Sequence, residues 1–330
     1  MSESTQTPTN VSDKIPTIRT VLLQWFEENR RDLPWRHTRD PYRILVSEVM
    51  LQQTQVDRVI SYYHAFLERF PSVDALAIAP TADVITLWAG LGYNRRAVNL
   101  QRTARYVHEE CGGQFPDSIA ELVKLPGIGP YTAGAIAAFA FEQDVAFVDT
   151  NMRRVIHRLF HGPDFPAFVA TEREILDLAS QLVPKNNGWR WNQALIEFGA
   201  LQCTSRRPAC VICPLQQSCA AFPLIQSVIA ALPTGSARKK EESFSGSNRY
   251  YRGRIVEALR NRTREAPESS GLTMRALGSL VRANFGDDDL PWLTGVIAGL
   301  ERDGLAKVAE EQPPYDPNND PLDNVRVQLP

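Results

Sequence analysis

Four cysteines close together are the side chains with the most evident capacity for chemistry. They follow the spacing C-x6-C-x2-C-x5-C in one turn-rich stretch, at Cys203, Cys210, Cys213 and Cys219. Thiolates gathered so closely either share a metal or pair as disulfides. The distance along the chain from first to last cysteine is wide for a zinc knuckle and suits a [4Fe–4S] cluster. Zinc and disulfides stay open as alternatives.

Two carboxyl groups lie in settings that should give them different protonation states. Glu48 is flanked by apolar residues in a predicted helix over 42–60, so we expect a raised pKa, as a general acid requires. Asp149 follows an apolar run and begins a predicted helix, where backbone N–H groups and the helix dipole favour the ionised form. Taken alone, Glu48 could equally face solvent, and Asp149 could be an ordinary helix N-cap.

A glycine hairpin separates two predicted helices. The stretch 125–133 reads L-P-G-I-G-P-Y-T-A. We expect Gly127 and Gly129 to supply the positive φ angles and close approach that a tight turn needs. The next helix starts with free N–H groups that can face a phosphate. The pattern is typical of a helix-hairpin-helix, which binds the DNA backbone, although a simple helix–helix turn also uses glycine.

The composition excludes several classes of protein. The 330 residues are 43% hydrophobic and 22% charged, with a formal net charge of −2, which is typical of an ordinary globular protein. No apolar run reaches the roughly 18 residues that a membrane span needs. The polar N-terminus lacks an apolar signal core, so we expect a cytoplasmic protein. Arginines cluster at 95–105 and 153–158, so local basic surfaces can exist beneath the near-neutral total.

The elements that must position these residues are mostly helices. After a flexible N-terminus at 1–16, residues 17–232 alternate amphipathic runs with short polar breaks, which predicts an all-α domain. The Ser-, Gly-, Lys- and Glu-rich stretch 233–248 is interpreted as a linker. Residues 249–330 contain further helical runs followed by short strands, which predicts a small winged-helix-like module. The runs are 250–260, 273–284 and 291–302, and the strands are 305–308 and 325–329.

The hairpin, Asp149 and the cysteine loop, in this order, resemble the helix-hairpin-helix DNA glycosylase superfamily that includes endonuclease III. Longer stretches are similar to the adenine DNA glycosylases, the MutY family. They are L-P-W-R at 33–36, D-P-Y at 40–42, S-E-V-M-L-Q-Q-T-Q-V at 47–56, L-W-A-G-L-G-Y at 87–93 and W-N-Q-A-L at 191–195. The resemblance covers residues 17–222. It implies a [4Fe–4S] cluster in the loop 203–219.

The resemblance also implies a partner and a reaction. The partner would be double-stranded DNA with a mismatched or damaged base pair, bound by a monomer associated with the nucleoid. The enzyme would hydrolyse the bond between adenine and its sugar after the base leaves the duplex stack. Glu48 would protonate the departing adenine at N7, and Asp149 would stay ionised and stabilise the cationic sugar. Tyr131 and Asn151 would support Asp149 or position the water.

DNA recognition is assigned to other residues by the same resemblance. Gln53 and Tyr93 would enter the duplex where the adenine departs, because a flat amide and a flat ring can stack on exposed bases. Together with Glu48, the pocket for the flipped purine would be lined by Arg31, Trp35 and Arg36.

Tyr131 predicts the subclass of the enzyme. The endonuclease III branch carries a lysine at the equivalent hairpin position, and that lysine attacks the sugar to form an imine. Because a phenol cannot form an imine, we predict a monofunctional glycosylase without efficient strand cleavage.

The C-terminal residues depart from the family pattern. Adenine glycosylases of this family usually carry a domain similar to nucleotide pyrophosphohydrolases, which recognises 8-oxoguanine opposite the adenine. Residues 249–330 lack its strand-rich pattern, so the partner base can be guanine or 8-oxoguanine. This departure also leaves a thymine or uracil glycosylase acting opposite guanine as the alternative. Thr150, where the adenine family often has glycine, is a small further mark for it. The run 52–55 favours adenine. A non-catalytic DNA-binding protein would lack one of the two acids, and both are present.

Overall fold

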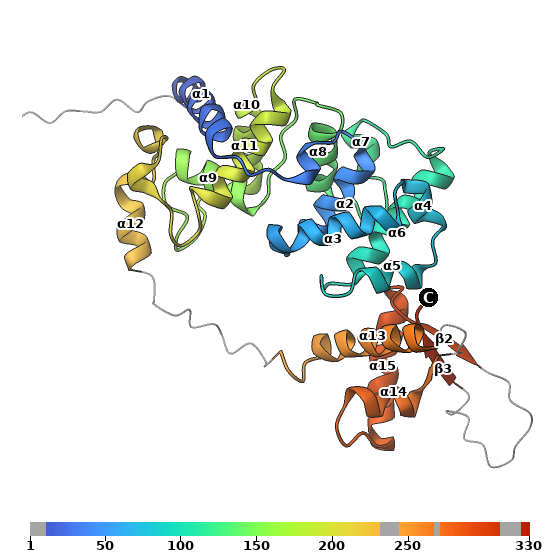
Figure 1. The fold of residues 1–330 in the computed structure, drawn as a ribbon. Helices are drawn as coiled ribbons and strands as arrows, with labels where there is room; N and C mark the ends of the chain where they lie inside the picture. Colours follow the sequence, from blue (N-terminus) through green and yellow to red (C-terminus); the bar gives the residue numbers. More distant parts are fainter. Residues whose placement is uncertain (1–10, 232–243, 267–270, 311–324) are drawn as a thin grey trace, which may run out of the picture. The chain divides into compact units, whose positions relative to one another are not determined.

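The computed structural model describes residues 11–231, 244–266, 271–310 and 325–330, and helices dominate it (Figure 1). The chain forms two compact units, each assembled from separate segments. Unit 1 comprises residues 1–48, 116–124 and 128–236, and unit 2 comprises 49–115, 125–127 and 237–330. Within the described ranges, none of the helices combines the length and apolar character needed to cross a membrane.

These units differ from the domain boundaries that the sequence suggested. They cut across the predicted domain 17–232, so that division stays a prediction. Helix α1 begins at Val11, within the N-terminal segment that we expected to be flexible as far as residue 16. Most of the predicted linker 233–248 lies outside the described residues, and its last residue already belongs to α13.

Unit 1 is built from helices. Its core includes α8 (Pro130–Phe139), whose residues from Thr132 onward are all buried, so this short helix is apolar on every face. The other helices of unit 1 each bury some of their residues. They are α1 (Val11–Asn29), α2 (Pro41–Leu51, continuing into unit 2), α7 (Ile119–Leu122), α9 (Thr150–Phe160), α10 (Glu172–Leu182), α11 (Gly188–Leu201) and α12 (Phe222–Ala230). Short 3-10 turns cover Pro34–Arg36, Cys210–Ile212 and Gln216–Ser218.

Unit 2 combines helices with a small sheet. Its N-terminal part contains α3 (Val56–Arg69), α4 (Val73–Ile78), α5 (Thr81–Leu87) and α6 (Arg95–Glu110). Its C-terminal part contains α13 (Asn248–Glu265), α14 (Met274–Val281), a 3-10 turn (Asp287–Asp289), α15 (Leu290–Arg302) and strands β1 (Leu272–Thr273), β2 (Lys307–Glu310) and β3 (Val325–Gln328). The strands run antiparallel in the order β1-β3-β2, with Val327 opposite both Leu272 and Val308. The sequence predicted β2 and β3 but missed the two-residue β1.

The C-terminal part of unit 2 shares a hydrophobic core with α5 and α6. Ile85 and Val98 from these helices are buried together with Ile255, Leu259 and Leu300. At the start of α5, the Ala82 amide also donates a 2.9 Å hydrogen bond to the carbonyl of Pro330. The N-terminal and C-terminal parts of unit 2 are therefore joined by apolar packing as well as by backbone hydrogen bonding.

Candidate active site

Glu48 is a buried carboxyl group on α2, with 7% of its surface exposed. Burial raises its pKa from 4.5 to about 7, and the nearby Asp149 charge raises it as well. A hydrogen bond from the Tyr131 hydroxyl opposes this rise in part. The prediction of a raised pKa from the apolar sequence around Glu48 is therefore confirmed.

Asp149 is the N-cap of α9. Its carboxylate accepts a 2.6 Å hydrogen bond from the Met152 amide and a longer one, 3.4 Å, from Asn151 Nδ2. Burial raises the pKa of Asp149, while these donors and the charge of Arg154 lower it. The donors at the helix start favour the ionised form, as expected, but burial outweighs them, so the net shift of the Asp149 pKa is upward.

Close packing against glycines fixes the segment that carries Asp149. A Cβ on Gly134 of α8 would lie 2.5 Å from the Cβ of Phe147, and one on Gly199 of α11 would lie 2.8 Å from the Cβ of Asn151. The Phe147 ring also meets Tyr131 edge to face, with centroids 5.3 Å apart. The absence of side chains at two helix positions therefore lets residues 147–151 approach both helices.

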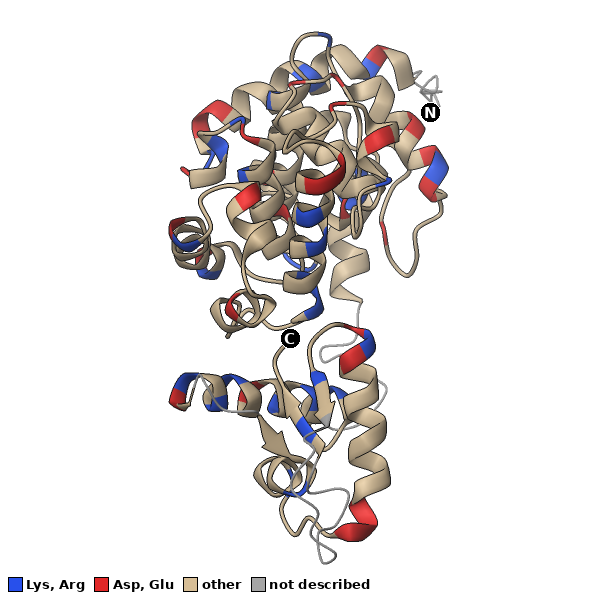
Figure 2. Cartoon of the chain, turned by 90° about the vertical axis from the view of Figure 1, so that its right-hand side faces the viewer, with Lys and Arg blue, Asp and Glu red and all other residues tan. Residues whose placement is uncertain are grey.

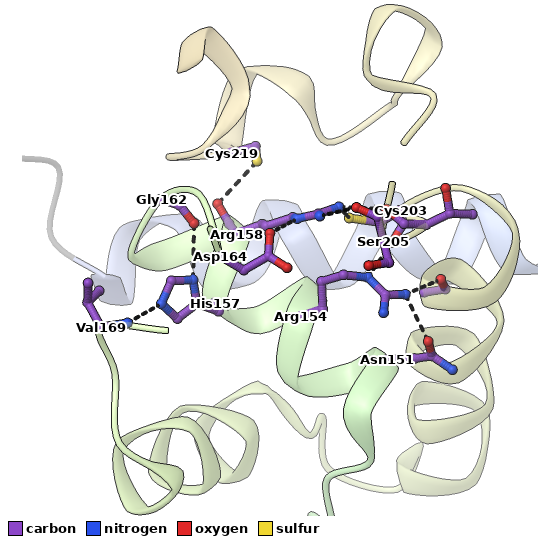
Figure 3. A network of polar contacts seen from close by, with 12 residues as sticks. Asn151, Arg154, His157, Arg158, Gly162, Asp164, Val169, Cys203, Ser205 and Cys219 are labelled. Carbon is purple, nitrogen blue, oxygen red and sulfur yellow. Dashed lines mark hydrogen bonds and ion pairs between the residues drawn. The ribbon is translucent and has the colours of Figure 1, made fainter. Parts of the chain in front are cut away.

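Helix α9 joins Asp149 to the cysteine loop through Arg154 (Figure 3). Its Nη2 donates to Asn151 Oδ1 at 2.8 Å and to the carbonyl of Gly199 at 2.6 Å. Its Nε donates to the carbonyl of Cys203 at 2.8 Å. The side chain that supports Asn151 thus also holds the backbone of the first cysteine.

One turn further along α9, Arg158 binds the same loop (Figure 3). It donates to the carbonyls of Thr204 and Ser205, both at 2.8 Å, and pairs with Asp164 at 2.6 Å. Its Nη1 lies 3.5 Å from the sulfur of Cys203. Arg158 therefore does not contribute to the basic surface expected at 153–158, because it is only 2% exposed and makes internal contacts.

The four clustered cysteines line one apolar cavity together with residues of α9, α11 and α12. All of them are free thiols, so the structure contains no disulfide in this loop. Burial raises the pKa of Cys213 to about 12 and that of Cys219 to about 11, and the neighbouring cysteines add to both shifts. A metal group would replace the thiol protons and relieve this cost, so the sulfur donors fit a thiolate-bound metal group.

A buried ion-pair cluster lies elsewhere in unit 1. Glu197 on α11 is fully buried and accepts two hydrogen bonds from the Arg31 side chain, at 2.9 and 2.7 Å. Arg36 Nη2 binds the same carboxylate at 3.0 Å, and Arg36 Nε binds Gln193 at 2.9 Å. Although burial acts to raise the pKa of Glu197, these guanidinium donors outweigh it and hold the value at about 2. Arg31 and Arg36 are therefore fixed by a carboxylate that sequence reasoning did not single out.

In unit 2, Gln53 and Tyr93 share an unusual backbone conformation. Their φ angles are 57° and 46°, a region that residues with side chains seldom adopt and that often marks functional segments. Arg96 ties their two loops together, since its Nη1 donates to the carbonyl of Gln52 at 2.7 Å and its Nη2 to that of Leu91 at 3.1 Å. Both side chains are exposed, Tyr93 to 46%.

The glycine hairpin matches its prediction at one position and not at the other. Gly127 has a φ of +82°, and a Cβ there would approach the Cβ of Asn99 to 3.0 Å. Gly129 has a φ of −93° and precedes α8 as its N-cap, so a positive φ is not needed there. The prediction for Gly129 was therefore wrong, because the turn is completed by the first glycine.

Comparison with known proteins agrees with this geometry. Residues 46–181 match the family model of HhH-GPD superfamily base excision DNA repair proteins. An adenine DNA glycosylase of Mycolicibacterium smegmatis is 40% identical over 244 residues, which cover 73% of this chain and 80% of the relative. The mouse adenine DNA glycosylase is 42% identical over 229 residues, or 66% of this chain and 44% of the relative. The chain belongs to the adenine DNA glycosylase family.

Solved structures of this superfamily share the fold. A thermostable thymine-DNA glycosylase matches with a TM-score of 0.60 and 32% identity, over 64% of this chain and 98% of that one. An endonuclease III trapped on DNA matches with a TM-score of 0.56 and 24% identity, over 64% and 96%. The helical, endonuclease III-like fold that the resemblance implied is therefore confirmed.

Within this family frame, unit 1 brings together Glu48, Tyr131, Asp149 and Asn151 through hydrogen bonds and charge. The buried Trp35 precedes Arg36 in the 3-10 turn, whereas Gln53 and Tyr93 belong to unit 2. Sequence reasoning passed over Glu197 and Arg96. Glu197 is the single charged residue in the run 191–201, which was an available signal for it. No such signal in the sequence distinguishes Arg96 from the other arginines of its segment.

Proposed function

We propose that this protein is a monofunctional DNA glycosylase that hydrolyses adenine from double-stranded DNA where it is mispaired with guanine or 8-oxoguanine. The observation that carries the proposal is the pair Glu48 and Asp149, the first buried and the second partly buried, both in contact with polar groups of unit 1. Two carboxyl groups with different environments are what glycosidic bond cleavage by acid catalysis requires.

In the proposed reaction, Glu48 supplies the proton. With a pKa of about 7, a large share of Glu48 is protonated at neutral pH, and it can deliver the proton to N7 of the flipped adenine. Protonation converts the base into a neutral leaving group. The Tyr131 hydroxyl hydrogen-bonds to Glu48 and so orients the acid.

Asp149 then stabilises the positive charge that develops on the sugar. The Met152 amide, Asn151 and Arg154 all favour its ionised form, which counteracts the effect of burial. These partners make Asp149 the carboxyl group that keeps its charge when Glu48 holds its proton. Water attack on the sugar completes a hydrolysis in which Tyr131, a phenol, forms no imine.

The remaining residues would bind DNA. We assign the purine pocket to Trp35, Arg31 and Arg36, with Glu197 holding both guanidiniums in place. We assign insertion into the duplex to Gln53 and Tyr93, because their exposed side chains sit on left-handed backbone.

We further assign a [4Fe–4S] cluster to Cys203, Cys210, Cys213 and Cys219. All four sulfurs line one apolar cavity. Four cysteine thiolates are the ligand set that such a cluster takes. Base excision involves no electron transfer, so the cluster would serve to fix the loop 203–219.

The C-terminal part of unit 2 fits a winged-helix-like module. Helices α13, α14 and α15 are followed by the strands β2 and β3, and β1 adds a third strand to the sheet.

An excision assay tests the proposed function. Duplexes carrying A opposite 8-oxoguanine, A opposite G, T opposite G and U opposite G are incubated with the protein, and strand breaks are scored with and without hot alkali. We expect breaks after alkali only in the two adenine duplexes. Excision confined to T or U would support the alternative thymine or uracil specificity, and breaks without alkali would contradict the monofunctional assignment.

A matched variant separates chemistry from binding. Asp149→Asn keeps a side-chain oxygen to cap α9 and removes the charge, so we expect DNA binding to persist while adenine release falls by about 10²-fold or more.

A further inference from the structure

Three consecutive residues at the start of α6, the two that precede the helix and its first residue, contact the C-terminal part of unit 2. Tyr93 meets Arg249, whose guanidinium donates to the Tyr93 hydroxyl. The side-chain oxygen of Asn94 accepts a 2.8 Å hydrogen bond from Arg260. Arg95 lies 3.5 Å from the carboxylate of Asp303. The segment proposed to enter DNA is therefore held along its length by residues about 150 or more positions later in the chain.

Helix α13, labelled in Figure 1, packs against the core of unit 2. Arg260 is only 3% exposed, and its Nε also donates to the carbonyl of Ile85 at 3.0 Å. Ile255 and Leu259 on the same helix are buried in the core that includes Ile85. Because this face of α13 is packed, the position of Arg249 in its first turn is set by the fold and not by a mobile loop.

Arg249 contacts Tyr93 in two ways. Its guanidinium carbon lies 4.6 Å from the centroid of the Tyr93 ring, within the range of a cation–π interaction, and a guanidinium nitrogen reaches the hydroxyl. The guanidinium of Arg96 lies 5.7 Å from the same ring. A half-exposed ring on left-handed backbone thus has its orientation defined by two cations.

Charge on α13 suits a DNA-facing role as well. The helix carries six arginines against two glutamates, although the protein as a whole is slightly acidic (Figure 2). Several of these arginines are engaged internally, Arg252 with Asp303 and Arg260 with Asn94. Arg249 is exposed, and its guanidinium contacts the Tyr93 ring.

We propose that Arg249 is a positioning residue that holds the Tyr93 ring in the orientation needed to enter mismatched DNA. The C-terminal module, which lacks the pattern of the usual 8-oxoguanine-reading domain, would then contribute to mismatch recognition through the geometry of Tyr93. The inference rests on the proposed function, because it takes Tyr93 as a residue that enters the duplex. A ring fixed before binding loses less conformational freedom on binding, which favours affinity.

Binding of a non-hydrolysable duplex tests this role. The probe contains 2′-fluoro-2′-deoxyadenosine opposite guanine, with 2-aminopurine beside it to report unstacking, at one fixed salt concentration. We expect Arg249→Ala to weaken binding about tenfold, the size expected for one cation–π contact plus one hydrogen bond, and to lower the 2-aminopurine signal at saturating protein.

Arg254→Ala is the matched control. It removes the same charge from the same helix, but Arg254 contacts the Leu280 carbonyl and the Tyr250 ring and hydroxyl, all within the C-terminal module. We expect its effect on binding to be less than twofold. An equal loss in both variants would overturn the proposal, since general charge attraction would then explain the result.

A double-mutant cycle repeats the Arg249→Ala substitution in a protein that already carries Tyr93→Ala. If Arg249 acts through Tyr93, its removal there costs no further affinity, whereas a full tenfold loss in that background would overturn the positioning role. An unchanged melting temperature excludes unfolding as the cause. Adenine excision by the unaltered protein is measured in parallel. Its absence would refute the proposed function, while normal excision with unaffected binding in Arg249→Ala would refute this inference alone.

Discussion

Glu48 and Glu197 are both buried in unit 1 and yet differ widely in acidity. Glu48 is 7% exposed with a pKa of about 7, and Glu197 is 0% exposed with a pKa of about 2. Glu48 faces a neutral phenol and a neighbouring carboxylate, whereas Glu197 is bound by two guanidiniums. Burial alone therefore does not determine protonation, because the charge of the partners decides which form is stable.

The two environments suit different tasks. A carboxyl group that keeps its proton near neutral pH can act as an acid in catalysis. A carboxylate that stays ionised well below neutral pH can hold arginines in fixed positions. The same residue type thus does chemistry in one place and orders a pocket in the other.

The strongest test of this contrast removes the acid. Glu48→Gln keeps the shape of the side chain and abolishes proton donation, so we expect adenine excision opposite guanine to fall by about 10²–10⁴-fold. Single-turnover excision at saturating enzyme measures the loss. Glu28→Gln, at an exposed position on α1, serves as the control and should keep full activity. Excision within threefold of normal in Glu48→Gln would remove Glu48 from the mechanism.

Glu197→Gln tests the structural half of the contrast. It leaves the buried guanidinium of Arg36 without its counter-charge, so we expect unfolding in urea to become easier by about 3–5 kcal/mol. Glu121→Gln breaks the exposed ion pair with Lys124 at 2.6 Å and should cost at most about 1 kcal/mol. If both variants lose the same small amount of unfolding free energy, the Glu197 cluster contributes little to the stability of the fold.

The pH dependence of stability should have opposite signs at the two glutamates. The folded pKa of Glu48 is raised from 4.5 to about 7, so its contribution is fully present below pH 4.5 and is lost as pH rises through 7. Glu48→Gln should therefore be more stable than the unaltered protein by about 3 kcal/mol at pH 8, and equally stable at pH 4.

Glu197 has a depressed pKa. Its contribution to the free energy of unfolding is therefore present above pH 4.5 and is lost as pH falls toward 2. Urea unfolding of the unaltered protein, Glu48→Gln and Glu197→Gln at several pH values measures both trends. Parallel pH profiles for the two variants would contradict the contrast.

The smallest expected effect concerns the phenol. Tyr131→Phe removes the hydroxyl whose hydrogen bond lowers the pKa of Glu48, so that pKa should rise further. We expect the alkaline limb of the pH–rate profile to move to higher pH, with a loss of about 1 kcal/mol in transition-state stabilisation from poorer orientation of the acid. A shift of that limb to lower pH would show that Tyr131 stabilises the protonated form instead.

Local sequence was enough to predict Glu48, because its immediate neighbours on α2 are apolar and bury it. It was not enough for Glu197 or Arg154, whose partners lie 166 and 49 positions away along the chain. The burial that raises the pKa of Asp149 could not be predicted for the same reason, since it comes from the fold around this residue. Strand β1 was not predicted, because its two residues are too few to show an alternating pattern.

Gly134 and Gly199 carry no functional group, and yet the segment between Phe147 and Asn151 depends on them. Any larger residue at either place would push this segment away from one of its two helices. Transplanting the two acids, the phenol and the amide into another helical scaffold would reproduce the reactive groups without their spacing. A designer who transfers this site to another protein would have to keep glycine at both positions along with the reactive side chains.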